Sequence, residues 1–155
     1  MKKGWLLLLF LLGLDLITKQ LALSSIPPLG YGVYPFGGIG LFSWNGITFS
    51  LNYIVNTGAA WGVFAGYSGW LFTLRVAIIF ALVLFVPKRL PIWLVITGAI
   101  GNAIDYCLYG HVIDFFHFTF WGYSFPIFNI ADACITLGIL SLLLLPNRAK
   151  EVQTS

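Results

Sequence analysis

Four of the five acidic residues in this chain of 155 residues lie within or beside long apolar segments. They are Asp15, Asp105, Asp114 and Asp132. An ionised side chain at the centre of a membrane-spanning helix costs at least about 2.5 to 3.5 kcal/mol, so it needs a partner or a purpose. These four carboxylates are therefore the first candidates for chemistry.

Asp114 and Asp132 occupy the ends of two consecutive apolar segments. Asp114 comes just after one segment, and Asp132 follows Pro126 by six residues at the start of the next. If the two segments are antiparallel helices, both carboxylates reach the same interface. Like charges so placed cannot both ionise easily, so the pair shares one proton and holds a general base beside a general acid. That state suits hydrolysis of a peptide bond, although two such residues could equally bind a cation or relay protons.

The other two acids have structural explanations. Asp15 and Lys19 are four residues apart, the spacing at which side chains meet on one helix face, and this favours an ion pair over catalysis. Asp105 and Asn102 are one turn apart near the end of the third apolar segment, where hydrogen bonds between helices are at least as plausible as chemistry.

Neither metal chemistry nor serine chemistry has a supporting motif. His111 and His117 are six residues apart and lack the His-Glu-x-x-His arrangement, so no metal site is expected. There is no Gly-x-Ser-x-Gly elbow for a serine nucleophile. Cys107 and Cys134 form no spaced framework and are interpreted as packing residues. We expect no cofactor.

The elements that hold these residues follow from composition. Hydrophobic residues make up 59% of the chain and charged residues only 8%, which excludes a soluble enzyme, a disordered segment and a nucleic-acid-binding protein. A helix crosses a bilayer with about 17 to 25 mostly apolar residues. Four segments qualify as spans, at about 5–23, 70–86, 92–108 and 127–145, and prolines mark the breaks between them and the end of the last.

The basic residues indicate the orientation of the spans. Six of the eight fall at the N-terminus, in the loop between the second and third spans, and after the fourth: Lys2, Lys3, Lys88, Arg89, Arg148 and Lys150. Basic residues concentrate on the cytoplasmic side, so both termini are predicted there. A cleaved signal peptide at the first span is disfavoured, because Asp15 and Lys19 interrupt its apolar core.

The outer connection 24–69 is expected to fold on the membrane surface. Residues 47–53 alternate apolar and polar side chains, which is typical of a strand with one face exposed to water. Asn45-Gly46 predicts a hairpin that joins this strand to residues 41–44. The second outer connection, 109–126, is predicted to be a loop. The expected fold is a single all-α membrane domain of four transmembrane helices, with a small periplasmic β-sheet on the outer leaflet.

Five short motifs resemble those of one known family, the bacterial lipoprotein signal peptidases or signal peptidase II. Their order and spacing agree with the family along nearly the whole chain. The motifs are Asp15-Leu16-Ile17-Thr18-Lys19, Asn56-Thr57-Gly58-Ala59-Ala60-Trp61-Gly62, Gly101-Asn102-Ala103-Ile104-Asp105, Gly110-His111-Val112-Ile113-Asp114-Phe115 and Phe128-Asn129-Ile130-Ala131-Asp132.

The resemblance implies an aspartic endopeptidase of the bacterial inner membrane, with its active site at the outer leaflet. Its partners would be membrane lipids and prolipoproteins, cut just before a diacylglyceryl-modified cysteine, and it would act as a monomer. Asp114 and Asp132 would be the catalytic pair. Supporting or substrate-binding roles are implied for Asn56, Gly58, Asn102, Asp105, Gly110, Asn129 and Ala131, and structural or supporting roles for Asp15 and Lys19.

One position departs from the family pattern. The third-helix motif normally continues from the aspartate into an arginine, but Tyr106 follows Asp105 here. The hydroxyl of Tyr106, or Arg75 in the outer part of the second span, would have to replace that arginine. Two other classes of protein stay open at this point: an ion or proton carrier that uses the buried aspartates, and a membrane scaffold.

Overall fold

The chain forms four helices and one antiparallel sheet. The computed structural model describes residues 2–27, 38–57, 68–86 and 89–144. The helices are α1 (Lys2–Ser25), α2 (Ser68–Phe85), α3 (Leu90–Tyr109) and α4 (Ile130–Leu144), and the strands are β1 (Ile39–Trp44), β2 (Ile47–Asn56), β3 (Val112–Phe120) and β4 (Tyr123–Ser124). All the residues predicted for the site except Gly58 lie in the described ranges.

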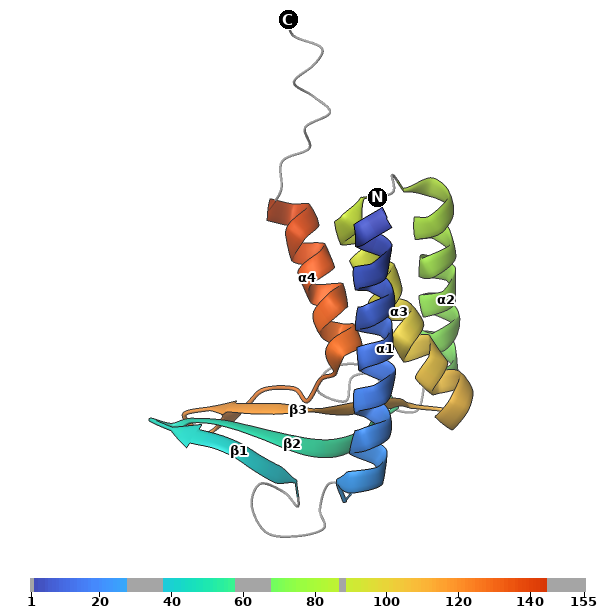
Figure 1. The fold of residues 1–155 in the computed structure, drawn as a ribbon. Helices are drawn as coiled ribbons and strands as arrows, with labels where there is room; N and C mark the ends of the chain where they lie inside the picture. Colours follow the sequence, from blue (N-terminus) through green and yellow to red (C-terminus); the bar gives the residue numbers. More distant parts are fainter. Residues whose placement is uncertain (1, 28–37, 58–67, 87–88, 145–155) are drawn as a thin grey trace, which may run out of the picture.

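The four helices stand side by side, and the sheet crosses one end of the bundle (Figure 1). The start of α1, the end of α2, the start of α3 and the end of α4 all lie at the opposite end (Figure 1). Among the described residues, α1 and α3 are long and apolar enough to cross a membrane, and α2 and α4 are shorter apolar helices. The helices match the predicted segments within three residues at each described end.

The fourth helix begins later than predicted because its first residues pair with the sheet. The N–H of Phe116 donates to the carbonyl of Phe128 at 2.8 Å, and the N–H of Phe128 donates back at 3.1 Å. Phe128 therefore forms an isolated bridge to β3, and α4 starts at Ile130. This pairing brings the start of α4 directly to β3.

The predicted hairpin is confirmed, and its second strand is longer than expected. Trp44 pairs with Ile47, and the turn residues Asn45 and Gly46 have φ of 46° and 82°, the left-handed conformations that a two-residue hairpin requires. Strand β2 continues beyond residue 53 to Asn56. Asn56 is consequently fixed at the end of a strand instead of following it.

The prediction of a loop at 109–126 is wrong, because most of this segment forms β3 and β4. The sheet has four strands in the order β1-β2-β3-β4, so it is larger than the small sheet expected beside an all-α bundle. Strand β3 reads Val-Ile-Asp-Phe-Phe-His-Phe-Thr-Phe and starts with four buried residues in succession. A strand buried on both faces lacks the apolar–polar alternation by which strands are recognised.

Two contacts hold the sheet and the helices in register. Ile113 and Phe115 of β3 are buried against Ala22 and Ile26 at the end of α1. At the other face, α3 and α4 approach so closely that a Cβ on Gly98 would overlap the carbonyl oxygen of Ala131. The sheet therefore packs against the end of α1, while the backbones of α3 and α4 are in close contact at Gly98 and Ala131.

Candidate active site

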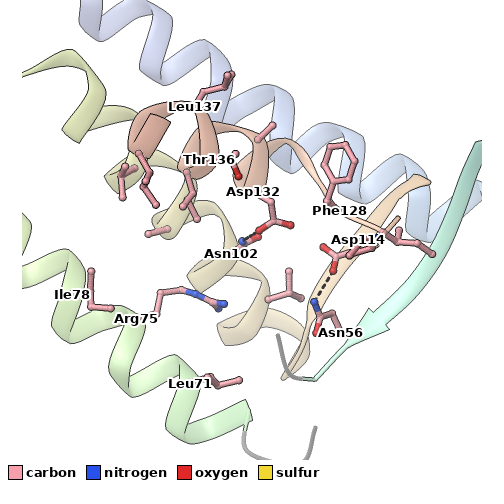
Figure 2. A pocket seen from close by; sticks show the side chains of 18 of the residues that line it. Asn56, Leu71, Arg75, Ile78, Asn102, Asp114, Phe128, Asp132, Thr136 and Leu137 are labelled. Carbon is pink, nitrogen blue, oxygen red and sulfur yellow. Dashed lines mark hydrogen bonds between the residues drawn. The ribbon is translucent and has the colours of Figure 1, made fainter. Parts of the chain in front are cut away.

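A cavity of about 940 Å³ opens between α2, α3, α4 and the ends of β2 and β3. Its wall is mostly apolar, with side chains such as Leu71, Ile78 and Leu137 along α2 and α4. The polar side chains gather at one end, where Asp114 and Asp132 point into the same space (Figure 2). The structure thus brings together the two carboxylates that the sequence predicts as a pair.

Asp114 is held by two amide side chains. The Nδ2 of Asn56 donates to its Oδ2 at 2.7 Å, and the Nδ2 of Asn129 donates to its Oδ1 at 2.7 Å. Asn56 pairs with Val112 in the sheet, two residues from Asp114, so both side chains project from the same face. The register of β2 against β3 therefore positions this carboxylate.

Asp132 lies in the first turn of α4 and takes part in the cap of that helix. The N–H of Asp132 donates to Oδ1 of Asn129 at 2.8 Å, and the N–H of Asn129 donates to Oδ2 of Asp132 at 3.2 Å. This is a reciprocal capping box. The other oxygen, Oδ1, accepts from Nδ2 of Asn102 at 2.7 Å. Asp132 is consequently fixed by α3 and by the helix terminus that it helps to form.

Asn129 connects the two carboxylates. Its side chain is fully buried, with Oδ1 on the N–H of Asp132 and Nδ2 on Oδ1 of Asp114. The same Nδ2 lies 3.0 Å from Oδ1 of Asn102 and 3.2 Å from the carbonyl of Ile113. One amide thus sets the relative position of two acids from different elements.

The pKa of Asp114 is raised to about 7. Burial is the main cause, because it penalises the ionised form, and the nearby charge of Asp132 adds to it. Hydrogen bonds from Asn56 and Asn129 act in the opposite direction. At neutral pH this carboxyl can therefore hold or release a proton, as an acid or base in hydrolysis must.

Lys19 is the centre of the supporting charges. Its Nζ lies 2.8 Å from Oδ2 of Asp15, 2.8 Å from Oδ2 of Asp105 and 2.9 Å from Oδ1 of Asn102. The predicted pair of Asp15 and Lys19 is confirmed, and Asp105 joins it from α3. An ammonium group has three protons to donate, and here three buried oxygens receive them.

The remaining predicted residues hold the backbone around the site. Oδ1 of Asp15 accepts the N–H of Ala131 at 2.8 Å, and Oδ2 of Asp105 accepts the N–H of Ile113 at 3.1 Å. Gly110 ends α3 with φ of 76°, which favours glycine, and turns the chain into β3. Gly58 lies outside the described residues.

The structure distinguishes between the two residues that could replace the missing arginine, Tyr106 and Arg75. Tyr106 stacks on Phe72 of α2, with ring centroids 4.6 Å apart, and is not among the residues that line the cavity. Arg75 does line the cavity, and its guanidinium points toward the side of Asn102 and Asp132 (Figure 2). Arg75 is therefore the basic side chain that α2 brings to the site.

Sequence reasoning did not identify the apolar part of the cavity or the central place of Lys19 in the network. The apolar wall carries no motif, because leucine and isoleucine at helical spacing are equally typical of packing. For Lys19, the available signal was a lysine inside an apolar span with more than one acid at the same depth. No cluster that could hold a metal ion occurs among the described residues.

Solved structures similar to this chain are of bacterial membrane enzymes. One, determined by the in meso method at 2.3 Å resolution, has a TM-score of 0.77 at 28% identity and covers 100% of this chain and 94% of its own. A second, at 1.9 Å resolution, has a TM-score of 0.73 at 30% identity and covers 93% and 92%. The class that fold and site define is that of a bacterial membrane enzyme with paired carboxylates.

Sequence comparison identifies the family. A family model described as signal peptidase (SPase) II matches residues 7–146. A lipoprotein signal peptidase of Gloeothece citriformis is 36% identical over 100% of this chain and 99% of its own length. Another, from Synechocystis sp., is 38% identical over 84% of this chain and 78% of its own. The chain belongs to the signal peptidase II family, a family of aspartic peptidases.

Proposed function

We propose that this protein removes the signal peptide from prolipoproteins by means of a water molecule activated between Asp114 and Asp132. The observation that carries the proposal is that both carboxylates face one cavity and are held there by amide donors from three elements. The curated relatives are named as lipoprotein signal peptidases, and the family is one of aspartic peptidases.

The mechanism uses one proton shared by the two carboxyl groups. The ionised member accepts a proton from water as the water oxygen attacks the carbonyl carbon of the scissile peptide bond. The protonated member then gives its proton to the leaving nitrogen, and the bond breaks to a carboxylic acid and an amine. After the products leave, the pair again holds one proton. Asn56, Asn102 and Asn129 keep both carboxyl groups oriented throughout.

The shape of the cavity suits a substrate that is itself anchored in lipid. An apolar wall along α2 and α4 leads to a polar end beside the sheet. A signal helix and two acyl chains can occupy apolar space, so their binding energy positions the peptide bond at the carboxylates. We therefore assign the cut to the bond before a diacylglyceryl-modified cysteine.

We propose that the bundle crosses the bacterial inner membrane with the sheet on its outer surface. Lys2 and Lys3 begin α1 and Arg89 precedes α3, all at the end of the bundle opposite the sheet (Figure 1). Basic residues concentrate on the cytoplasmic side, so we assign the start of α1 and the end of α4 to that side. The sheet exposes large apolar and aromatic side chains suited to the headgroup region, including Phe42, Trp44, Trp121 and Tyr123.

A proton or ion carrier is less well supported. A relay needs ionisable groups through the depth of the membrane, but Asp15 and Asp105 share Lys19 and bond the backbone at the starts of α4 and β3, beside the other two acids. Within the described helices, residues 4–14, 76–85, 90–104 and 133–144 contain no ionisable acid or base apart from Cys134. The buried charges of these helices therefore do not form a continuous path for protons or ions across the membrane.

The proposed function is tested with one prolipoprotein in two forms, with and without the diacylglyceryl group on its cysteine. We expect the purified protein in detergent to cut the lipidated form before the cysteine and to leave the other form largely intact. Mass spectrometry of the products locates the cut, and a chelator should have no effect. Equal cleavage of both forms, or no cleavage of either, would contradict the proposal.

The pH dependence of cleavage follows from the shared proton. Because the pKa of Asp114 is raised to about 7, the pair keeps its proton up to that pH and loses it above, when no general acid is left. In acid both carboxyl groups are protonated and no base is left. We expect the plot of kcat/KM against pH to be bell-shaped. Its alkaline limb should fall near pH 7 and report the loss of the proton that the two carboxyl groups share. A rate that keeps rising well above pH 8, about one unit beyond that limb, would contradict a shared proton.

A further inference from the structure

Arg75 is a cation on a cavity wall with no anionic partner in contact. It is half-buried in the middle of α2, and it makes no salt bridge or hydrogen bond with another described residue. The other buried charges have partners within the protein. Lys19 forms ion pairs with Asp15 and Asp105, and the carboxylates of Asp114 and Asp132 accept hydrogen bonds from amide side chains. An arginine within a span is retained at a considerable energetic cost, so an unpaired one is a candidate for function.

On the α2 side of the cavity, Arg75 has only apolar neighbours among the described lining residues. The cavity-lining residues of α2 are Leu71, Leu74, Arg75 and Ile78, so Arg75 is the polar one among those described. The paired carboxylates project from β3 and α4, and Arg75 projects from α2 across the same space (Figure 2). A substrate that lies between α2 and α4 consequently has the acids on one side and the guanidinium on the other.

We propose that Arg75 binds main-chain carbonyl oxygens of the substrate peptide beside the scissile bond, on the side opposite the two carboxylates. A guanidinium group has five N–H donors in a planar fork and no acceptor, so its partner must be an acceptor. An extended peptide directs successive carbonyls to opposite sides. When one carbonyl faces the acids, its neighbours face Arg75. The inference rests on the proposed function, because it names how that substrate is held.

Kinetics of three variants test this role with the lipidated prolipoprotein in detergent. We expect Arg75→Gln to raise KM about 10- to 100-fold, since hydrogen bonds from a charged donor are lost. Arg75→Lys keeps the charge but not the fork, so KM should rise about five- to tenfold while the pH profile stays that of the wild type. Thr73→Val is the matched control on α2, because Thr73 is exposed and its Oγ1 bonds the carbonyl of Gly69 in its own helix.

Two results would overturn the inference. An unchanged KM in Arg75→Gln with a shifted pH profile would mean that Arg75 acts only through the charge of the acids. A wild-type KM in Arg75→Lys would mean that charge alone suffices and no carbonyls are bound by the fork. If the wild type itself fails to cut the lipidated substrate, the proposed function fails instead, so the two failures are distinguishable.

The ester carbonyls of the diacylglyceryl group are the other acceptors within reach of such a residue. A substrate with two ether-linked alkyl chains lacks these carbonyls but keeps the peptide. We expect Arg75→Gln to raise KM by the same factor for the ester-linked and ether-linked substrates. A KM effect confined to the ester-linked substrate would overturn the assignment to the peptide.

Discussion

Asp114→Asn and Asp132→Asn are each expected to lower the kcat for prolipoprotein cleavage by about 10²- to 10⁴-fold. Either change leaves a carboxamide that can neither take a proton from water nor give one to the leaving amine, and general acid–base catalysis contributes about this factor. Asparagine nearly preserves the volume of aspartate. The loss should therefore appear in kcat, measured by gel-based cleavage, more than in KM.

Both variants also disturb hydrogen bonds. The two oxygens of Asp114 accept from amide side chains, and those of Asp132 accept from the side chain of Asn102 and the N–H of Asn129, so an asparagine at either position places its amide NH₂ group against another donor. Thermal unfolding in detergent should show whether either variant retains the fold. Ser124→Ala, in the exposed strand β4 outside the cavity wall, is a matched control expected to keep wild-type kcat. Activity retained in either aspartate variant, in a folded protein, would contradict the paired mechanism.

Lys19→Met is expected to destabilise the protein by about 3–5 kcal/mol. Removing one partner of a buried charge network leaves the others unpaired, and Lys19 serves the buried carboxylates Asp15 and Asp105. It also bonds Oδ1 of Asn102, whose Nδ2 holds Asp132. We therefore expect a lowered unfolding temperature in detergent together with reduced cleavage.

A matched triple variant separates charge from packing. Lys19→Met combined with Asp15→Asn and Asp105→Asn removes the cation and both anions with little change in volume. Replacing a whole buried charge network is often nearly neutral, whereas breaking it is not, so much of the lost stability should return. If the triple variant were no more stable than Lys19→Met alone, unpaired carboxylates would not be the cause.

The site could be predicted in part because its residues stand out in an apolar chain. Asp114 and Asp132 were recognisable as a pair from their places at the ends of two segments, and Asp15 with Lys19 from their helical spacing. Strand β3 was missed, since its burial on both faces removes the alternation that marks a strand. With β3 missed, the pairing of Asn56 beside Asp114 could not be foreseen.

The sequence indicated a membrane protein with four apolar segments and a resemblance to one family, and it predicts which end of the bundle faces the cytoplasm. Hydropathy, charge placement and motif order are properties of the chain read in one dimension. The three-dimensional structure was needed to show that Asn129 joins the two acids, that Lys19 pairs with both Asp15 and Asp105, and that Arg75 lines the cavity while Tyr106 does not. These contacts join separate elements, and they depend on strand register and helix packing, where a shift of one residue turns a side chain to the opposite face.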